Sequence, residues 1–319
     1  MRRREFIGVF GVGLAGPLAL AQEPGRAYRL AFVVQPQRAV FGALFDELQQ
    51  LGFIEGKNLI VDLRGFGLAV KDLEATALEV AAQKPDAIYA GGAVAGRAVK
   101  KATKTIPVVL SSDDMIGDRI VKSLARPGGN ITGISILAPE LDDKRLGLLL
   151  ETTPGIHHVA ALVDPATTLP GQLEALVRIA RSHGVELSIH RAASAGEIGG
   201  AIASARASNA EAFTVLTSAL FHAHRPELIG RIRETRLPAI YQWPEYCAEG
   251  ALMAYGPRFT SMYRQAARML VKVLKGAKPA DMPVEQPTQL ELAINLKVAK
   301  ELDLTIPAAL RLAADEVIE

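Results

Sequence analysis

The stretch that decides the fold runs from Tyr28 to Gly52 and reads YRLAFVVQPQRAVFGALFDELQQLG. Residues 28–34 form a short apolar run, which is typical of a buried strand. The apolar residues between Phe41 and Leu51 then recur at helical spacing, and Gly52 ends the pattern. A strand followed by a helix is the repeating unit of a parallel sheet covered by helices. This stretch therefore predicts an α/β fold.

The same unit recurs through the chain in two consecutive sets. In the first set we predict strands at residues 28–34, 59–63, 86–90, 107–110 and 131–136, and helices at 41–51, 73–83, 94–103 and 117–124. In the second set we predict strands at residues 158–163, 185–190, 212–216 and 238–241, and helices at 141–151, 169–182, 197–208 and 226–235. Each set has the usual size of a domain, so two similar lobes are favoured over one long sheet.

The domain boundaries follow from this division. We expect residues 28–136 to form the first lobe, with part of 250–282 returning to it. Residues 137–249 are expected to form the second lobe, with part of 283–319. The crossovers near Leu137, Gly250 and Pro283 are then the expected hinges.

Residues 1–21 have the pattern of an export signal peptide. Three arginines, Arg2 to Arg4, precede an uncharged apolar stretch, and Ala19 and Ala21 are small residues that suit a signal peptidase. The stretch is too short for a stable membrane span, and its arginine pair is similar to a twin-arginine signal. The single cysteine, Cys247, lies far from this segment and leaves no site for a lipid there. We therefore predict a soluble periplasmic protein that is not lipid-anchored.

The charge argues against a nucleic-acid partner. The chain has a net charge of +2, and residues 2–5 alone account for it, with three arginines against one glutamate. The mature protein is therefore close to neutral, whereas nucleic-acid-binding proteins carry basic surfaces. We expect a monomer that binds a small molecule.

Polar and small residues follow the predicted strands, where open parallel sheets bind their ligands. The candidate ligand-binding residues are Gln35, Gly91, Gly92, Ser111, Ser112, Asp113, Asp114, Thr217, Ser218, Trp243, Glu245 and Tyr255. Hydroxyls and the amides after a glycine turn suit a carboxylate, acids suit an ammonium group, and Trp243, Tyr246 or Phe41 suits an apolar side chain. Taken one at a time, these residues are equally typical of helix caps and turns.

Catalytic and metal-binding patterns are absent from the sequence. It contains no His-Glu-x-x-His, no phosphate-binding loop and no Gly-x-Ser-x-Gly. The pairs His157–His158 and His222/His224 have no obvious third ligand. We therefore predict no catalytic residue, no metal and no cofactor.

Three segments, in this order along the chain, resemble a known family. They are SLARPGGNITG at residues 123–133, GALMAYGP at 250–257 and a tail that begins LKGAKPADMPVEQPT at 274–288 and continues through NLK at 295–297 to ADEVI at 314–318. The chain resembles the substrate-binding proteins of ABC transporters, a family that includes tryptophan- and other aromatic-amino-acid-binding members. The resemblance implies a periplasmic-binding-protein fold of type I, in which each lobe is a parallel sheet flanked by helices and the ligand cleft lies between the lobes.

The resemblance also bears on the site. Family positions match at the Gly91–Gly92 turn, Asp114, Thr217–Ser218 and Tyr255. Two positions depart from the pattern, because Met115 replaces a proline and Ser218 stands where many relatives carry an acid or an amide. Either Asp113 or Glu245 then takes the ammonium group, or the ligand is not an ordinary amino acid.

The function implied is that of a periplasmic solute-binding component of an ABC importer. Such a protein captures a small carboxylate-bearing ligand, an amino acid or an aromatic acid, by closing its lobes, and then docks on a membrane permease. Two alternatives stay open: a periplasmic ligand-sensing protein for a signalling receptor, and an exported cofactor-dependent enzyme.

Overall fold

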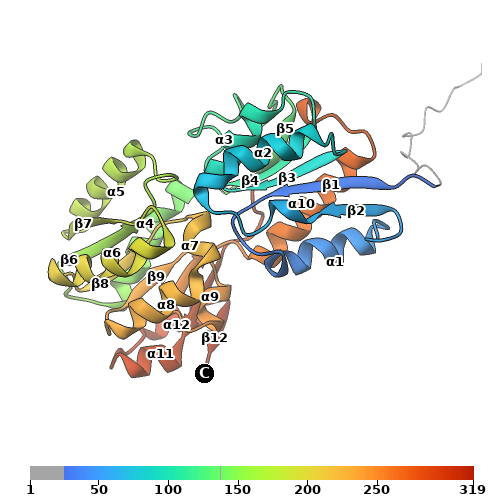
Figure 1. Cartoon of the computed structure of the whole chain (residues 1–319). Helices are drawn as coiled ribbons and strands as arrows, with labels where there is room; N and C mark the ends of the chain where they lie inside the picture. The colour runs from blue at the N-terminus through green and yellow to red at the C-terminus, as the bar shows by residue number, and fades with distance from the viewer. Residues whose placement is uncertain (1–24, 137) are drawn as a thin grey trace, which may run out of the picture.

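The computed structural model describes residues 25–136 and 138–319. The predicted signal peptide and the expected hinge at Leu137 lie outside the described residues. Two α/β lobes stand side by side, with the blue-to-cyan strands in one and the green-to-red strands in the other (Figure 1). The two-lobed fold class is confirmed. Among the described residues, no helix has the length and apolarity that a membrane span needs.

The first lobe is built on a parallel sheet with the strand order β2-β1-β3-β4-β5. Its strands are β1 (Tyr28–Val33), β2 (Leu59–Asp62), β3 (Ala87–Gly91), β4 (Val108–Ser112) and β5 (Ile131–Ser135). Its helices are α1 (Gly42–Gln50), α2 (Leu73–Ala82), α3 (Ala93–Ala102) and the returning α10 (Phe259–Leu274), with 3-10 turns at η1 (Arg38–Phe41), η2 (Leu63–Gly65), η3 (Val70–Asp72) and η4 (Pro279–Asp281).

The alternation of side chains along β1 explains how both faces of this sheet are covered. Leu30 and Phe32 point to the face covered by α1 and α10, whereas Ala31 and Val33 point to the face covered by α2 and α3. All four side chains are buried, so the strand reads as a continuous apolar run.

The second lobe is built on a mixed sheet with the order β12-β11-β10-β9-β8-β6-β7. Its strands are β6 (His158–Val163), β7 (Glu186–Arg191), β8 (Ala212–Val215), β9 (Ala239–Tyr241), β10 (Met253–Gly256), β11 (Glu291–Asn295) and β12 (Glu316–Ile318). Its helices are α4 (Ala138–Thr152), α5 (Pro170–Ser182), α6 (Ala195–Ala207), α7 (Ala219–Ala223), α8 (Arg225–Glu234), α9 (Glu245–Ala248), α11 (Leu296–Glu301) and α12 (Ala308–Ala313). Strand β11 runs antiparallel to β10, so this sheet is not purely parallel as expected.

The segment that returns to the first lobe is 259–285. Helix α10 packs against α1, and Arg268 on α10 pairs with Glu47 on α1 at 2.9 Å. The chain then runs beside β5, where Glu285 N donates to Gly133 O at 2.8 Å and Thr132 Oγ1 donates to Met282 O at 3.0 Å. It crosses back to the second lobe only after Glu285, at β11.

Two expectations about this region were wrong. Gly250 is not a crossover: it lies within the second lobe, between α9 and β10, in a left-handed turn with φ +104°. The crossover follows β10, at residues 257–258. Residues 117–124 do not form a helix, because Asp114 Oδ1 accepts hydrogen bonds from Ile116 N and Gly117 N and Arg119 is left-handed at φ +55°. The apolar residues Ile120 and Val121 are buried there, but they lie in irregular turns and not on a helix face.

Candidate functional site

A cavity lies between the lobes at the carboxyl ends of the strands. We call it the interlobe cavity. Its lining residues are Pro36, Phe41, Tyr89, Gly91, Gly92, Ser111, Asp113, Ile136, Thr217, Ser218, Ala219, His222, Trp243, Phe259, Met262 and Tyr263. Both lobes contribute to this lining.

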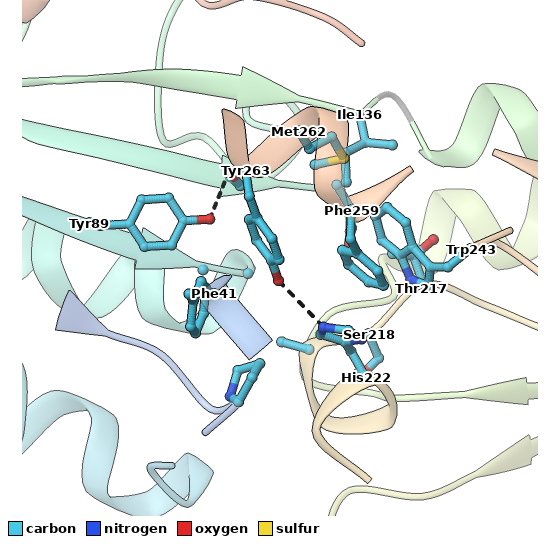
Figure 2. A pocket seen from close by; sticks show the side chains of 16 residues that line it. Phe41, Tyr89, Ile136, Thr217, Ser218, His222, Trp243, Phe259, Met262 and Tyr263 are labelled. Carbon is cyan, nitrogen blue, oxygen red and sulfur yellow. Dashed lines mark hydrogen bonds between the residues drawn. The ribbon is translucent and has the colours of Figure 1, made fainter. Parts of the chain in front are cut away.

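Stacked aromatic rings form much of the wall. Phe259 lies between His222 and Trp243, with ring centroids 3.8 Å from each (Figure 2). Tyr263, one turn further along α10, faces Phe41 of the first lobe at 5.0 Å. A wall of this kind can stabilise the aromatic ring of a ligand, because it buries apolar surface and allows contacts between rings.

The glycine turn after β3 brings the two lobes into contact. Gly92 is the N-cap of α3, has a left-handed φ of +88°, and donates its N–H to Ser111 O at 2.8 Å. A Cβ built on Gly92 would lie 2.8 Å from the Cβ of Ala219 in the second lobe. Only a glycine therefore allows the lobes to approach this closely.

Carboxylates from both lobes face one another beside the cavity. Burial raises the pKa of Asp113 to about 7, and the nearby Asp118, Asp142 and Asp164 raise it further while Arg145 opposes them. Burial likewise raises the pKa of Asp118 to about 6, against the effect of its ion pair with Arg97 at 2.8 Å. A cation placed here would relieve this repulsion.

Two polar atoms of the lining are buried and have no hydrogen-bond partner among the described residues: Thr217 Oγ1 and Trp243 Nε1. Buried polar groups are nearly always hydrogen-bonded in folded proteins. The indole N–H can only donate, so it needs an acceptor. These atoms are therefore suited to oxygens of a ligand.

A buried hydrogen-bonded chain lies behind the rings. His222 Nδ1 is 3.1 Å from Tyr246 Oη and its Nε2 is 3.4 Å from Tyr263 Oη. Burial lowers the pKa of His222 well below its usual value, so its imidazole is neutral. On the opposite wall Tyr89 donates to Ser111 Oγ at 3.1 Å, and burial raises the pKa of Tyr89 to about 12.

The structure brings most of the sequence-predicted residues to the cavity. Those that line it are Gly91, Gly92, Ser111, Asp113, Thr217, Ser218 and Trp243. Of these, Ser218 is also a helix cap, because its Oγ accepts from Leu220 N at 3.0 Å and donates to Asp164 Oδ2 at 2.7 Å.

The other predicted residues lie elsewhere. Gln35 lines a neighbouring, wider part of the cleft, Ser112 lies beside Asp118, and Asp114 caps a turn. Glu245 accepts from Thr260 N at 3.4 Å, next to the start of α10. Tyr255 packs in the core of the second lobe, and its carbonyl accepts from Arg145 Nε at 2.8 Å.

Sequence reasoning missed Tyr89, His222, Phe259, Met262 and Tyr263 as lining residues. The sequence around His222 suggests no role beyond metal binding, and among the described residues no group of three or more His, Cys, Asp or Glu side chains is placed to hold a metal. The start of α10 looked like an ordinary apolar helix face. Only its position at the crossover places these rings in the cleft.

Comparisons with known proteins agree with this architecture. A curated tyrosine-binding protein from Clostridioides difficile (strain R20291) is 25% identical over 272 residues, which cover 85% of this chain and 76% of that protein. A Vibrio cholerae conserved domain protein has a TM-score of 0.83 at 24% identity, over 92% of this chain and 100% of that one. An ABC domain from Streptococcus pneumonia in complex with L-Trp has a TM-score of 0.81 at 24% identity, with the same coverage. The sequence model described as ABC transporter substrate binding protein matches residues 31–318, and the chain belongs to this family of ABC transporter substrate-binding proteins.

Proposed function

We propose that this protein is the periplasmic solute-binding component of an ABC importer and that it captures an aromatic amino acid in the interlobe cavity. The observation that carries the proposal is the pairing, in one cavity, of stacked aromatic rings with the half-buried carboxyl of Asp113 and polar atoms that have no partner among the described residues. The relatives that bind tyrosine and L-Trp support the same ligand class.

In this proposal different residues of the cavity contact different groups of the ligand. The ring lies against Phe41, Phe259 and Tyr263, where apolar contact and ring stacking stabilise it. The ammonium group faces Asp113, whose charge the ligand stabilises. The carboxylate accepts from Trp243 Nε1 and Thr217 Oγ1 through charge-assisted hydrogen bonds.

Binding draws the lobes together. Because the lining residues come from both lobes, a ligand contacts its full set only when the cleft is closed, and it shifts the population toward that form. The closed protein then docks on a membrane permease and releases its cargo. No bond of the ligand is made or broken.

The direct test is calorimetry of the purified protein, refolded to remove any copurified ligand, with L-tyrosine, L-tryptophan, L-phenylalanine, L-leucine and L-aspartate. We expect the aromatic amino acids to bind tightest and aspartate not to bind. Phe259→Ala should weaken aromatic ligands by about tenfold, since it removes the ring that holds His222 and Trp243 in place in the cavity wall. Phe45→Ala, a phenylalanine of α1 outside the cavity, is the control and should leave affinity unchanged. Aromatic amino acids that bind no tighter than leucine would contradict the proposal.

The raised pKa of Asp113 predicts a pH dependence with a definite sign. In the free protein its pKa is about 7, so below that pH the carboxyl is largely protonated and must lose its proton to face an ammonium group. Affinity should therefore fall by about tenfold between pH 7.5 and pH 6. The effect on stability has the opposite sign: a raised pKa makes this group stabilise the ligand-free fold as pH falls from about 7 toward 4.

Calorimetry across this range checks the pH prediction. Asp113→Asn should bind weakly and with little pH dependence, whereas Asp114→Asn, at the neighbouring turn-capping acid, should keep the wild-type profile. A flat profile in the wild-type protein would show that Asp113 does not face the ligand cation.

A further inference from the structure

The buried chain Tyr246–His222–Tyr263 connects the protein interior to the cavity. Tyr246 is completely buried in the second lobe, His222 lines the cavity, and Tyr263 lines it from α10 of the first lobe. Figure 2 shows the Tyr263 hydroxyl directed at the imidazole. The contact therefore joins the two lobes at the wall of the cavity.

The hydrogens in this chain can be placed by counting donors and acceptors. A neutral imidazole carries one N–H donor and one acceptor nitrogen. Each ring nitrogen of His222 faces one tyrosine hydroxyl, so one tyrosine donates to the ring and the other accepts from it. Two arrangements are thus possible, and they differ in which tyrosine keeps a hydroxyl hydrogen for another partner.

Both tyrosines are buried, but only Tyr263 lines the interlobe cavity, and this difference distinguishes the two arrangements. Tyr246 Oη has no other hydrogen-bond partner among the described residues, so its hydrogen is satisfied only by donating to His222 Nδ1. The alternative leaves the buried hydroxyl hydrogen of Tyr246 without an acceptor, which costs about 1–3 kcal/mol. His222 therefore carries its proton on Nε2 and donates it to Tyr263 Oη. The hydroxyl hydrogen of Tyr263 is then free to donate into the cavity.

Tyr263 lies at the aromatic end of the cavity. Its ring centroid is 5.0 Å from that of Phe41 and 5.7 Å from that of Phe259. Asp113 is surrounded by charged groups, namely the carboxylates of Asp118, Asp142 and Asp164 and the Arg145 guanidinium, and we take it as the site of the ligand's ammonium group. A ligand whose ammonium faces Asp113 thus directs its ring toward the Tyr263 hydroxyl.

We propose that Tyr263, oriented by His222 and Tyr246, selects an aromatic amino acid whose ring bears a hydrogen-bond acceptor, a phenol rather than a phenyl or indole ring. This inference rests on the proposed function. A phenol oxygen accepts from Tyr263, a phenyl ring leaves that donor unsatisfied, and an indole N–H offers only a second donor. Tyr263 is the specificity-determining residue, and His222 and Tyr246 are positioning residues.

Calorimetry with purified full-length variants tests the selection. The wild-type protein should bind L-tyrosine about five- to tenfold tighter than L-phenylalanine, the range expected for one neutral hydrogen bond. Tyr263→Phe should remove this difference by weakening L-tyrosine alone, with L-phenylalanine changed less than about twofold. Tyr28→Phe, at a buried tyrosine that packs against Phe53 outside the cavity, is the matched control and should keep the full preference.

Nitrogen NMR of histidine-labelled protein tests the orientation independently of affinity. The His222 signals of the ligand-bound protein should show the proton on Nε2, and Tyr246→Phe should shift them toward the Nδ1–H form and reduce the preference for L-tyrosine. A proton on Nδ1 in the wild-type protein, or equal affinity for L-tyrosine and L-phenylalanine, overturns the inference and leaves the proposed function standing. If no aromatic amino acid binds, both fail.

Discussion

Gly92→Ala is expected to weaken ligand binding by about a hundredfold. The added Cβ would lie 2.8 Å from the Cβ of Ala219 in the facing lobe, closer than carbon atoms pack. It would also occupy a backbone conformation, with φ +88° and ψ 161°, that is essentially restricted to glycine and costs another residue about 1–3 kcal/mol. The lobes would therefore stop short of closure, and a ligand would contact only one of them at a time.

The neighbouring residues provide the controls for this prediction. Gly91→Ala should bind almost normally, because its Cβ meets only the Val34 side chain at 3.3 Å and its φ is not left-handed. Adding Ala219→Gly to Gly92→Ala removes the opposing methyl group and should restore part of the affinity. Small-angle scattering with saturating ligand should show the wild-type protein compact and Gly92→Ala extended. Wild-type affinity in Gly92→Ala would mean that the ligand does not need this closed contact.

Asp142→Ala is expected to lower the free energy of unfolding by about 3–5 kcal/mol. Asp142 and Arg145 form a buried ion pair on α4 at 3.0 Å, with side chains 6% and 1% exposed. Arg145 also donates from Nε to Tyr255 O, so it ties α4 to β10, and the second oxygen of Asp142 accepts from Gln172 Nε2 at 2.8 Å. Removal of the carboxylate takes away the ion pair and a hydrogen bond of a guanidinium that is held out of water. Denaturant unfolding of the ligand-free protein measures the change.

Adjacent Asp143 is the matched control for Asp142. It pairs with His183 at 3.1 Å, but its side chain is 62% exposed, so Asp143→Ala should change stability by less than about 0.5 kcal/mol. The double variant Asp142→Leu/Arg145→Met removes both charges together and should recover most of the loss. Equal stability of Asp142→Ala and the wild-type protein would show that Arg145 is solvated despite its burial.

The strands and long helices could be predicted because local pattern and tertiary role agree there. β1 is apolar on both faces, which is the signature of a strand covered on both sides, and α1 repeats its apolar residues at helical spacing. At residues 117–124 the apolar spacing was misleading, because an Asp114 turn and the left-handed Arg119 compete with helix formation. The antiparallel β11 was also missed, since a single strand carries no mark of its direction.

Part of the site followed from topology alone. Strand ends converge in any open parallel sheet, so Gly92, Asp113 and Trp243 could be proposed before their positions were known. Tyr255 and Asp114 also lie near strand ends, but neither lines the cavity. Tyr255 packs against the core of the second lobe and Asp114 caps a turn, because the direction of a side chain depends on what packs around it.

The sequence by itself determined the α/β class, the two lobes, the strand-end residues and the family. These features depend on the periodicity of apolar residues and on short motifs, both of which are local in the chain. Only the tertiary structure decided which aromatic rings face the ligand and how the lobes meet. α10 leaves the second lobe after residues 257–258, packs on the first, and places Phe259 and Tyr263 against His222, a residue distant in the chain. The packing of α10 against α1 creates that contact, and no local pattern encodes it.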